Sequence, residues 1–519
     1  MTKNNKFTLG FLIFLTSGFS GVSIAETAKT TDNSLKLVHP YQVSHRFSGI
    51  ITGDTPLVSL AVVQKNALKP VLKELTRGRS IAGSAVEPTE QDFPKDFRDF
   101  TKAFYAVNSA ASLDKLIADY NSKYDTLSPE TKLVVTHLSV LKPLRGILYR
   151  LRYVFEKEST AVHSSTVTAI RSLTSSMLIY LPTDQWKAGL EYVSIPSKLN
   201  AENTQFANIG QVQDYLVRVV TPILQTAIDR IKPLYLASGT TKILFDNKIA
   251  YGTGAFDDGM NRFKIIDTGE FAFDLAQLEM SIFHIDFFCS YNQDQLLQAA
   301  EDLARLTGIN GFLPFSDLGV SSENRVKKVF QKSKYKSYLT LYTQDGYGNK
   351  LMKDAGARLS SALSYYQDGW KSVVDREPSA LEFTKTKVAQ ANDSHMQMRF
   401  TTMNSLLNGT PVRSKITGNT VQFKLANLFQ NPPVDLKALM PIAFESGSRE
   451  LKVTTETNDQ LTYRNYSKGR AIAWNNAAWA SFVPSAAGQS PGYMAEALNT
   501  LKYTYGGEMA LKGASFFVH

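Results

Sequence analysis

A single cysteine, Cys289, is the feature that most limits how this 519-residue chain can fold. One cysteine cannot form an intrachain disulfide, so a disulfide-rich secreted scaffold is excluded. The thiol lies in the aromatic stretch FHIDFFCSYN, where we expect it to be a buried small hydrophobe. Hydrophobic residues make up 43% of the sequence, enough for ordinary cores. A chain of this size predicts about two to four domains.

The N-terminal segment 1–25 is typical of an export signal. Lys3 and Lys6 give it a positive start, and an apolar stretch beginning with FLIFL leads to the small-x-small site SIA. An uncleaved anchor helix is the alternative, but the apolar run is shorter than the roughly 20 residues that span a bilayer. The residue directly after the cleavage site is Glu26, not a cysteine that could accept a lipid. We expect an exported, periplasmic chain that begins at Glu26 and reaches the outer membrane only through partners.

The chain is basic, with a formal net charge of +10. Cleavage removes two lysines and no acid, and +10 minus 2 leaves +8 on the mature chain. For an exported protein, nucleic acid is not an expected partner. Anionic lipid headgroups of the outer-membrane periphery, peptidoglycan and acidic faces of neighbouring proteins suit this charge better, and simple solubility is the alternative.

The pattern along the chain predicts a multi-domain α+β fold. After the signal segment 1–25, an extended region and linker at 26–91 contain the small, polar stretch TRGRSIAGSAVEPTEQDFP. We expect a helical domain at 92–235, a mixed α/β domain at 236–378 and a strand-rich α+β domain at 379–519. The fold class is thus a helical N-terminal half, a mixed α/β centre and a strand-rich C-terminal region.

Local patterns support the helical part of this division. Ser128, Pro129 and Glu130 form a helix start, because serine caps, proline fits the first helical position and glutamate suits the positive end. Pro143 and Gly146 then break the helix. In IGQVQDYLVRVVTPILQTAIDRIK, apolar residues recur at helical spacing. They are Val212, Leu216, Val219, Ile223, Ala227 and Ile231.

Other patterns predict the strands. KILFDNKIAY is expected to form two short strands and NRFKIIDTG another, ahead of the helical stretch DLAQLEMSIFHIDFF. Nearer the C-terminus, NTVQFKL, RELKVTTE and QLTYRNY have the composition of strands. Because of these three segments, we expect a strand-rich C-terminal region.

The stretch KIIDTGEFAFD resembles the catalytic loop of an aspartic protease, with Asp267 as the acid. Such enzymes need two close carboxylates that share a proton, and single-chain members carry the loop twice. This chain carries it once, and Glu270 stands where those enzymes usually keep a small residue. We therefore expect a turn at Thr268 and Gly269, with Asp267 or Glu270 capping the helix that follows.

The remaining motifs for chemistry are incomplete. FHIDFF resembles the metal-binding segment of lipid kinases but lacks the glycine after Asp-Phe, so we expect His284 and Asp286 on the polar edge of a helix. YGTGAFDDG lacks a third glycine for a dinucleotide fingerprint and predicts a hairpin turn. No two histidines have the spacing of a helical zinc site. The sequence predicts no cofactor, no metal and no catalytic residue.

Two segments have the composition of docking surfaces. The basic segment, 325–339, alternates lysines with apolar residues, and a solvated helix face is its alternative. The aromatic segment, 463–484, has the composition of interface cores, and a small domain core is its alternative. The candidate docking residues are Arg325, Lys327, Lys328, Lys332, Tyr463, Arg464, Tyr466, Trp474 and Trp479.

The leader FLIFLTSGFSGVSIAET and the long chain after it resemble the accessory proteins of the outer-membrane core complex of the Legionella Dot/Icm type IVB secretion system. The resemblance implies a periplasmic subunit that binds neighbouring subunits of a ring, and it transfers no functional residue. The missing lipid-acceptor cysteine sets the chain apart from the lipoprotein members of such complexes.

The sequence therefore favours a non-catalytic structural or interaction subunit of a bacterial cell-envelope assembly. One alternative is a secreted or periplasmic hydrolase, with a site in the central α/β region around Asp267 and close titratable groups lining a pocket. Another is a soluble module that binds envelope glycan or lipid in an exposed aromatic groove.

Overall fold

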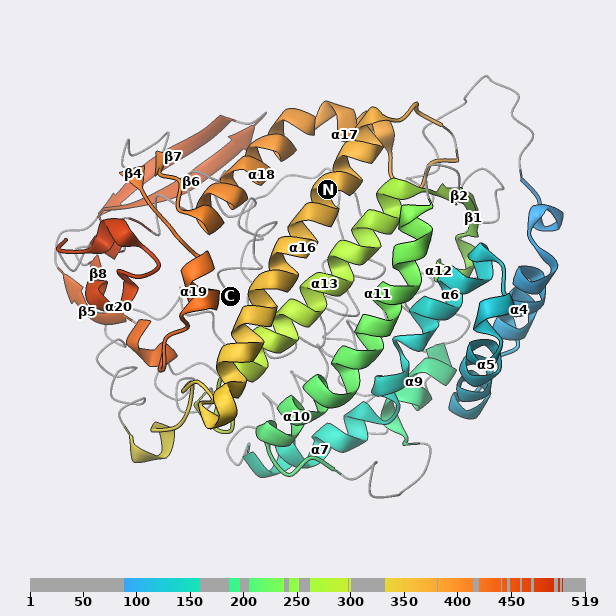
Figure 1. Ribbon diagram of the computed structural model, residues 1–519, viewed down its shortest axis with the longest axis horizontal. Helices are drawn as coiled ribbons and strands as arrows, with labels where there is room; N and C mark the ends of the chain where they lie inside the picture. Colours follow the sequence, from blue (N-terminus) through green and yellow to red (C-terminus); the bar gives the residue numbers. More distant parts are fainter. Residues whose placement is uncertain are drawn as a thin grey trace. The chain divides into compact units, whose positions relative to one another are not determined.

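The computed structural model of the chain consists mainly of helices (Figure 1). It describes residues 88–158, 186–196, 205–237, 242–251, 262–299 without 297, 332–379, 381–413, 420–439 and most of 441–497. The signal segment and nearly all of the extended region lie outside these residues. Tertiary contacts divide the chain into a first unit, Met1–Ile285 with Ser361–Ala391, and a second unit, Asp286–Ser360 with Asn392–His519. The domain limits expected from the sequence stay predictions.

The first unit begins with short helices. They are η3 (Glu90–Asp92), α4 (Lys95–Tyr105), α5 (Ala110–Ser122), η4 (Tyr124–Thr126), α6 (Pro129–Ser139), η5 (Lys142–Leu144), α7 (Ile147–Glu158) and α9 (Trp186–Ser194). Ser128 caps α6 by accepting a hydrogen bond from the Thr131 amide, and Pro129 opens the helix. Gly146 follows η5 at a φ of +67°, so the chain turns before α7. The predicted helix start and the predicted break are both confirmed.

The predicted long amphipathic helix contains a π-helical segment. It runs through α10 (Ile209–Tyr215), the π segment η8 (Leu216–Val220) and α11 (Thr221–Leu236). Pro222 has no amide hydrogen, so the turn before it cannot close the usual α-helical bond and widens. The extra residue rotates the apolar face by one position. Val219 is consequently exposed, contrary to the helical spacing, and Val220 and Leu224 are buried in its place.

An antiparallel pair of strands, two long helices and two short ones complete the description of the first unit. The elements are β1 (Ile243–Asp246), α12 (Lys248–Tyr251), β2 (Phe263–Ile266), most of α13 (Thr268–Ser290), the C-terminal part of α16 (Tyr347–Asp375) and α17 (Thr386–Ala391). The two strands pair antiparallel, with Ile243 opposite Ile266. The helices α13 and α16 approach closely at two glycines, since a Cβ on Gly369 would lie 2.9 Å from the carbonyl oxygen of Gly269 (Figure 1).

The second unit is not strand-rich. Its helices include η12 (Ser333–Tyr335), η13 (Gln344–Gly346), α18 (Asp393–Asn408), α19 (Ala426–Gln430), η14 (Leu436–Leu439), α20 (Asn476–Trp479) and η15 (Pro484–Ala486). Its strands are β3 (Val412–Arg413), β4 (Thr420–Val421), β5 (Pro441–Glu445), β6 (Arg449–Thr457), β7 (Gln460–Ser467) and β8 (Ala471–Trp474). Each of its sheets in the described residues has only two strands.

The expected α+β class with a strand-rich C-terminal region is therefore wrong, because the described part of the chain is predominantly helical. Strand-like composition located β1, β2, β6 and β7, whereas KIAY, expected as a strand, forms α12. Strands that pair with a single neighbour do not build the core. The core of the second unit instead uses α18, where Leu406 is buried against Phe423, Phe482 and Val483. Helix α18 was not predicted from the sequence, although Met396 and Phe400 are buried at helical spacing. Cys289 is buried, as predicted.

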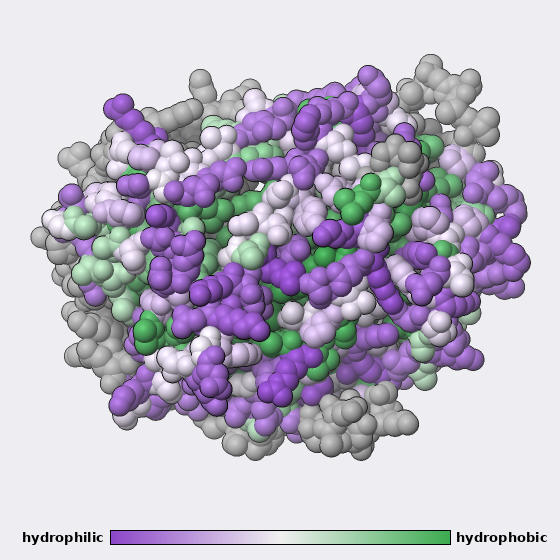
Figure 2. Space-filling view, viewed as in Figure 1, coloured by the Kyte–Doolittle hydropathy of each residue, from purple (hydrophilic) through white to green (hydrophobic). Residues whose placement is uncertain are grey.

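The described surface is largely hydrophilic. Figure 2 shows hydrophobic residues of one face lying between polar side chains. The most exposed large apolar residues, Leu236 and Val434, belong to different units and stand far apart in the sequence. Among the helices that the structure describes, none combines the length and apolarity needed to cross a bilayer.

Candidate functional site

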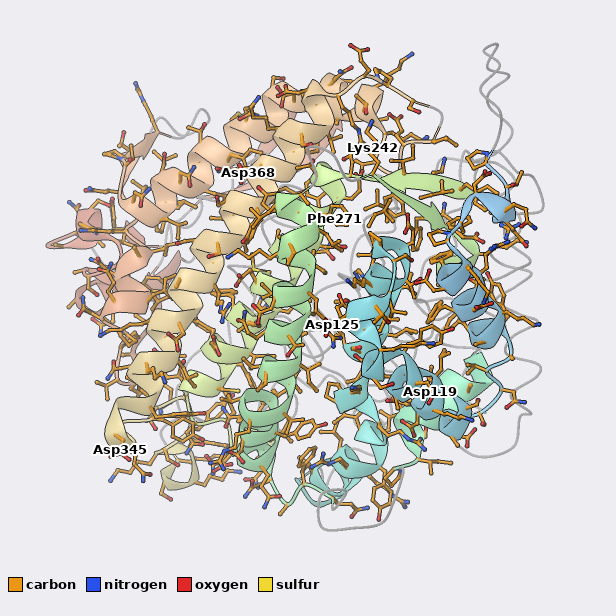
Figure 3. The ribbon with its side chains drawn as sticks, turned by 45° about the vertical axis from the view of Figure 1, so that its right-hand side comes forward. Asp119, Asp125, Lys242, Phe271, Asp345 and Asp368 are labelled. Atoms are coloured by element: carbon orange, nitrogen blue, oxygen red, sulfur yellow. The ribbon has the colours of Figure 1, made fainter. Side chains whose placement is uncertain are left out.

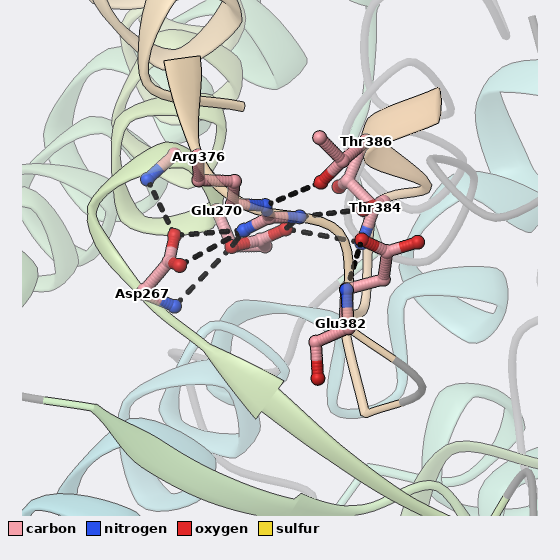
Figure 4. Close-up of polar contacts among 8 residues, drawn as sticks. Asp267, Glu270, Arg376, Glu382, Thr384 and Thr386 are labelled. Carbon is pink, nitrogen blue, oxygen red and sulfur yellow. Dashed lines mark hydrogen bonds and ion pairs between the residues drawn. The ribbon is translucent and has the colours of Figure 1, made fainter. Parts of the chain in front are cut away.

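The motif at Asp267 forms the junction between β2 and α13 (Figure 4). Asp267 Oδ1 accepts a hydrogen bond from the Gly269 amide at 3.1 Å. Glu270 Oε2 accepts one from the Asp267 amide at 3.2 Å. Two side chains thus satisfy two backbone amides at the helix start, as in a capping box except that the cap accepts from the second helical residue, not the third. The expected capping role of Asp267 and Glu270 is confirmed, and both residues share it.

One arginine binds both carboxylates of this junction. Arg376, just after the end of α16, places Nη1 2.9 Å from each carboxylate oxygen of Asp267 and 3.1 Å from Glu270 Oε2. Its Nη2 donates to Glu270 Oε1 at 3.1 Å and also to the Thr384 carbonyl. Its Nε donates to Thr386 Oγ1 at 2.9 Å. The Thr384 amide completes the set by donating to Glu270 Oε1 at 3.0 Å. We call Asp267, Glu270 and Arg376 the junction cluster.

The junction cluster is largely removed from water. Side-chain exposure is 17% for Asp267, 6% for Glu270 and 16% for Arg376. Burial raises the pKa of Glu270 to about 7, and the Arg376 guanidinium offsets only part of this. Burial opposes the charge of Arg376 as well, but the two carboxylates outweigh it and hold the pKa of Arg376 above its ordinary value. The cluster is a compensated ionic core that ties three segments of the first unit together.

This arrangement differs from a protease dyad. In such a dyad, one proton is shared between two carboxylates that activate a water. Here a guanidinium contacts all four carboxylate oxygens, and three of these oxygens also accept hydrogen bonds from backbone amides. The donors and acceptors are therefore already used in joining β2, α13 and the segment after α16. The geometry supports a structural role for Asp267.

A second set of titratable groups lies beside β2. Lys264 is buried on this strand, and burial lowers its pKa to about 8, with nearby Lys385 adding to the effect and Glu382 opposing it. Glu382 lies 3.9 Å from Lys385 and accepts a hydrogen bond from the Ser379 amide. The Ile265 amide donates to the Leu381 carbonyl at 2.7 Å, so this loop runs along β2. Titratable groups that lie close together and have shifted pKa values are also typical of active sites. This set of groups is therefore compatible with the hydrolase alternative.

Arg376 is the functional neighbour that sequence reasoning missed. It lies 109 residues after Asp267, and no local pattern links the two positions. The motif could be interpreted as a cap from its own residues, because Asp-x-x-Glu before an apolar run is a known helix start. The cation that compensates the two acids could only be found from the tertiary structure.

The other predicted motifs have different outcomes. Asp286 is buried and burial lowers the pKa of His284 to about 4, so the expected polar edge is wrong for this part of α13. The motif YGTGAFDDG lies outside the described residues after Tyr251. Within the described residues, no group of three or more histidine, cysteine or acidic side chains is placed to hold a metal ion.

The candidate docking residues are described only in part. Arg325, Lys327 and Lys328 lie outside the described residues, whereas Lys332 is exposed. Tyr463, Arg464 and Tyr466 lie on β7, opposite Val453, Lys452 and Glu450 of β6, and Trp474 ends β8. The side chains of these four lie outside the described part. Trp479 is half-buried against the core of the second unit and donates from Nε1 to the Leu439 carbonyl at 3.1 Å.

Comparison with known proteins gives no relative: no family model matches the chain, and neither does any curated protein or solved structure.

A histidine and an aspartate join α6 to α13 near the junction. His137 Nε2 lies 3.4 Å from Asp274 Oδ2, and His137 Nδ1 lies 2.9 Å from the Leu133 carbonyl oxygen. A carbonyl can only accept, so Nδ1 must carry a proton, while Nε2 faces a carboxylate. Burial alone would lower the pKa of His137, but Asp274 and the Leu133 carbonyl raise it above its ordinary value.

We expect this pair to make stability depend on pH. Because the pKa of His137 is higher in the folded chain than in the unfolded one, the contribution is complete below about pH 6.5 and is lost as the pH rises through the folded value. His137→Gln should flatten the fall in melting temperature between about pH 6 and about pH 9, measured by calorimetry at fixed ionic strength. Asp274→Asn should flatten it similarly. Unchanged slopes in both variants would show that the pair does not titrate in this range.

Proposed function

We propose that the chain is a non-catalytic interaction subunit of a bacterial cell-envelope assembly, exported to the periplasm and built into an outer-membrane core complex of the type IV secretion kind. The observation that carries the proposal is the junction cluster. In the stretch that resembles an aspartic-protease loop, Asp267 caps α13 and pairs with Arg376. With this loop in a structural role, we place the function on the protein's surfaces.

The described end of the basic segment supports a docking role. Lys332, Lys334 and Lys336 are exposed, whereas Tyr335 and Tyr338 beside them are buried. The aromatic rings therefore anchor the segment and leave the lysines on the surface. Lys437 strengthens the anchor by donating to the Tyr338 carbonyl and pairing with Asp435 at 3.0 Å. Such a surface suits an acidic face of a neighbouring subunit.

Charge reversal tests this role. We expect the triple variant Lys327→Glu, Lys328→Glu and Lys332→Glu to capture its envelope partners at least about tenfold less than wild type, because like charges facing each other across an interface cost several kcal/mol. The readout is quantitative pull-down of the tagged full chain from envelope extracts.

The control reverses three other exposed lysines, at Lys350, Lys353 and Lys387. The control variant has the same net charge as the triple variant, so a nonspecific effect of charge should weaken both equally. Full capture by the triple variant, or equal loss in the two, would remove the basic segment from the docking role.

A hydrolase remains the second candidate function, favoured by the buried Lys264 of β2 and by the raised pKa of Glu270 in the first turn of α13. It requires Asp267 or a neighbour to act on a substrate. The substitution Asp267→Asn separates the two candidate functions.

A further inference from the structure

Arg230 of α11 is half-buried and contacts three other elements of the first unit. None of these contacts is with an acidic side chain. Arg230 Nη1 donates to Asn121 Oδ1 of α5 at 2.8 Å and to Ser139 Oγ of α6 at 3.4 Å. The guanidinium carbon lies 4.0 Å from the ring centroid of Tyr124 in η4. The Tyr124 hydroxyl is held in turn by Thr136 Oγ1 at 2.9 Å. The position of Arg230 is therefore well fixed.

The surroundings of Arg230 are positively charged. Lys142 lies in η5, just after the α6 residue Ser139 that accepts a hydrogen bond from Arg230. Burial and the positive charge of Arg230 both lower the pKa of Lys142. Lys132 contributes a third cation, with Nζ 5.8 Å from the centroid of the Tyr124 ring. Asp125 is exposed on the same turn (Figure 3). Among the described residues, no carboxylate forms an ion pair with Arg230, Lys142 or Lys132.

Three other arginines of the first unit pair with acids, although Arg150 stacks on Phe206 and Tyr215 instead. Arg145 pairs with Asp114 at 2.9 Å, Arg262 pairs with Asp246 at 2.8 Å, and Arg376 pairs with two acids of the junction cluster. Buried charges are normally compensated in this way. Arg230 instead has only neutral acceptors, both at Nη1, and its Nε and Nη2 meet no acceptor within the described part of the chain.

We propose that Arg230 and Lys142, with Lys132 at the edge, form a binding site for a phosphate group. The unused edge of the guanidinium presents parallel N–H groups, the geometry that suits two oxygens of a phosphate. A neighbouring ammonium suits the second negative charge of a phosphate monoester or inorganic phosphate better than it suits a single carboxylate. Stacking on Tyr124 fixes the guanidinium in advance of binding.

The phosphate could come from a soluble phosphorylated compound or from a phospholipid headgroup, and the inference does not depend on the docking role of the basic segment. The first arm of the test uses inorganic phosphate. The full mature chain is titrated calorimetrically with sodium phosphate, against sodium chloride at the same ionic strength. We expect saturable binding that Arg230→Gln and Lys142→Gln each weaken at least about tenfold.

The matched control is Arg218→Gln. Arg218 belongs to the same continuous helical run, but its side chain is 77% exposed and pairs with Asp214. This control should bind phosphate as wild type does. Arg230→Lys keeps the positive charge but lacks the parallel N–H groups of the guanidinium. Its melting temperature shows whether a substitution at this position disturbs folding. Equal phosphate binding by Arg230→Gln and Arg218→Gln would overturn the proposal and leave an adventitious ion only.

The second arm uses vesicles of phosphatidic acid, whose headgroup is a phosphate monoester, and phosphatidylcholine, compared with vesicles of phosphatidylcholine alone. Retention on the anionic vesicles that Arg230→Gln abolishes and Arg218→Gln keeps would assign the phosphate to a lipid headgroup. Phosphate binding without this retention would assign it to a soluble compound. Absence of both phosphate binding and retention contradicts the proposal.

Discussion

Replacing Arg376 by methionine should lower the free energy of unfolding by about 3–5 kcal/mol, because the substitution leaves two largely buried carboxylates without their cation. Methionine keeps much of the side-chain volume, so the loss reports charge and hydrogen bonds more than packing. Asp267 and Glu270 have no other cation partner among the described residues. Denaturant unfolding of the purified chain, followed by fluorescence and circular dichroism, measures the change.

The matched control for this variant is Lys371→Met. Lys371 lies on α16 near Arg376 and also pairs with an aspartate, but both partners are exposed, at 74% for Lys371 and 56% for Asp375. Exposed pairs of this kind contribute below about 0.5 kcal/mol. A similar, small effect of both substitutions would show that the junction cluster does not hold the first unit together.

Asp267→Asn should destabilise the chain by about 1–3 kcal/mol and leave partner capture intact. Asparagine still caps a helix well, so the loss comes from the charge-assisted bonds to Arg376. Because Asp267 and Arg376 are in contact, combining Asp267→Asn with Arg376→Met should cost less than the sum of the single changes, by about 0.5–3 kcal/mol. The readouts are denaturant unfolding and the pull-down from envelope extracts.

Asp375→Asn is the control for Asp267→Asn, since it makes the same chemical change at an exposed aspartate of α16. It should change stability little. The opposite pattern for Asp267→Asn, with stability unchanged and biological function lost, would indicate that Asp267 takes part in chemistry and would favour the hydrolase.

Sequence reasoning succeeded where the determinant is local. The start of α6 follows from Ser128 and Pro129, and the cap of α13 follows from Asp267 and Glu270, because each set lies within one helical turn. A proline also explains the π segment before α11, but the resulting shift of the buried face was not anticipated. A prediction from periodicity assumes one uniform helix. A single wider turn changes which of the following residues are buried.

The sequence could not show what depends on distant partners. Strand-like composition says that a segment suits an extended backbone, but it does not say how many neighbours will pair with it. That is why β6 and β7 were located correctly while the strand-rich region around them was not. For the same reason, Arg376 in the junction cluster and the grouping of Arg230 with Lys142 required tertiary structure.

The most direct test of the account is the native size of the protein in its own host. Envelopes are extracted with mild detergent, and the extract is separated under native conditions and probed for the chain. We expect most of the protein to migrate with a very large complex, and the basic-segment triple variant to be released from it. Migration of the wild-type chain as a free monomer would contradict the proposal of an assembly subunit.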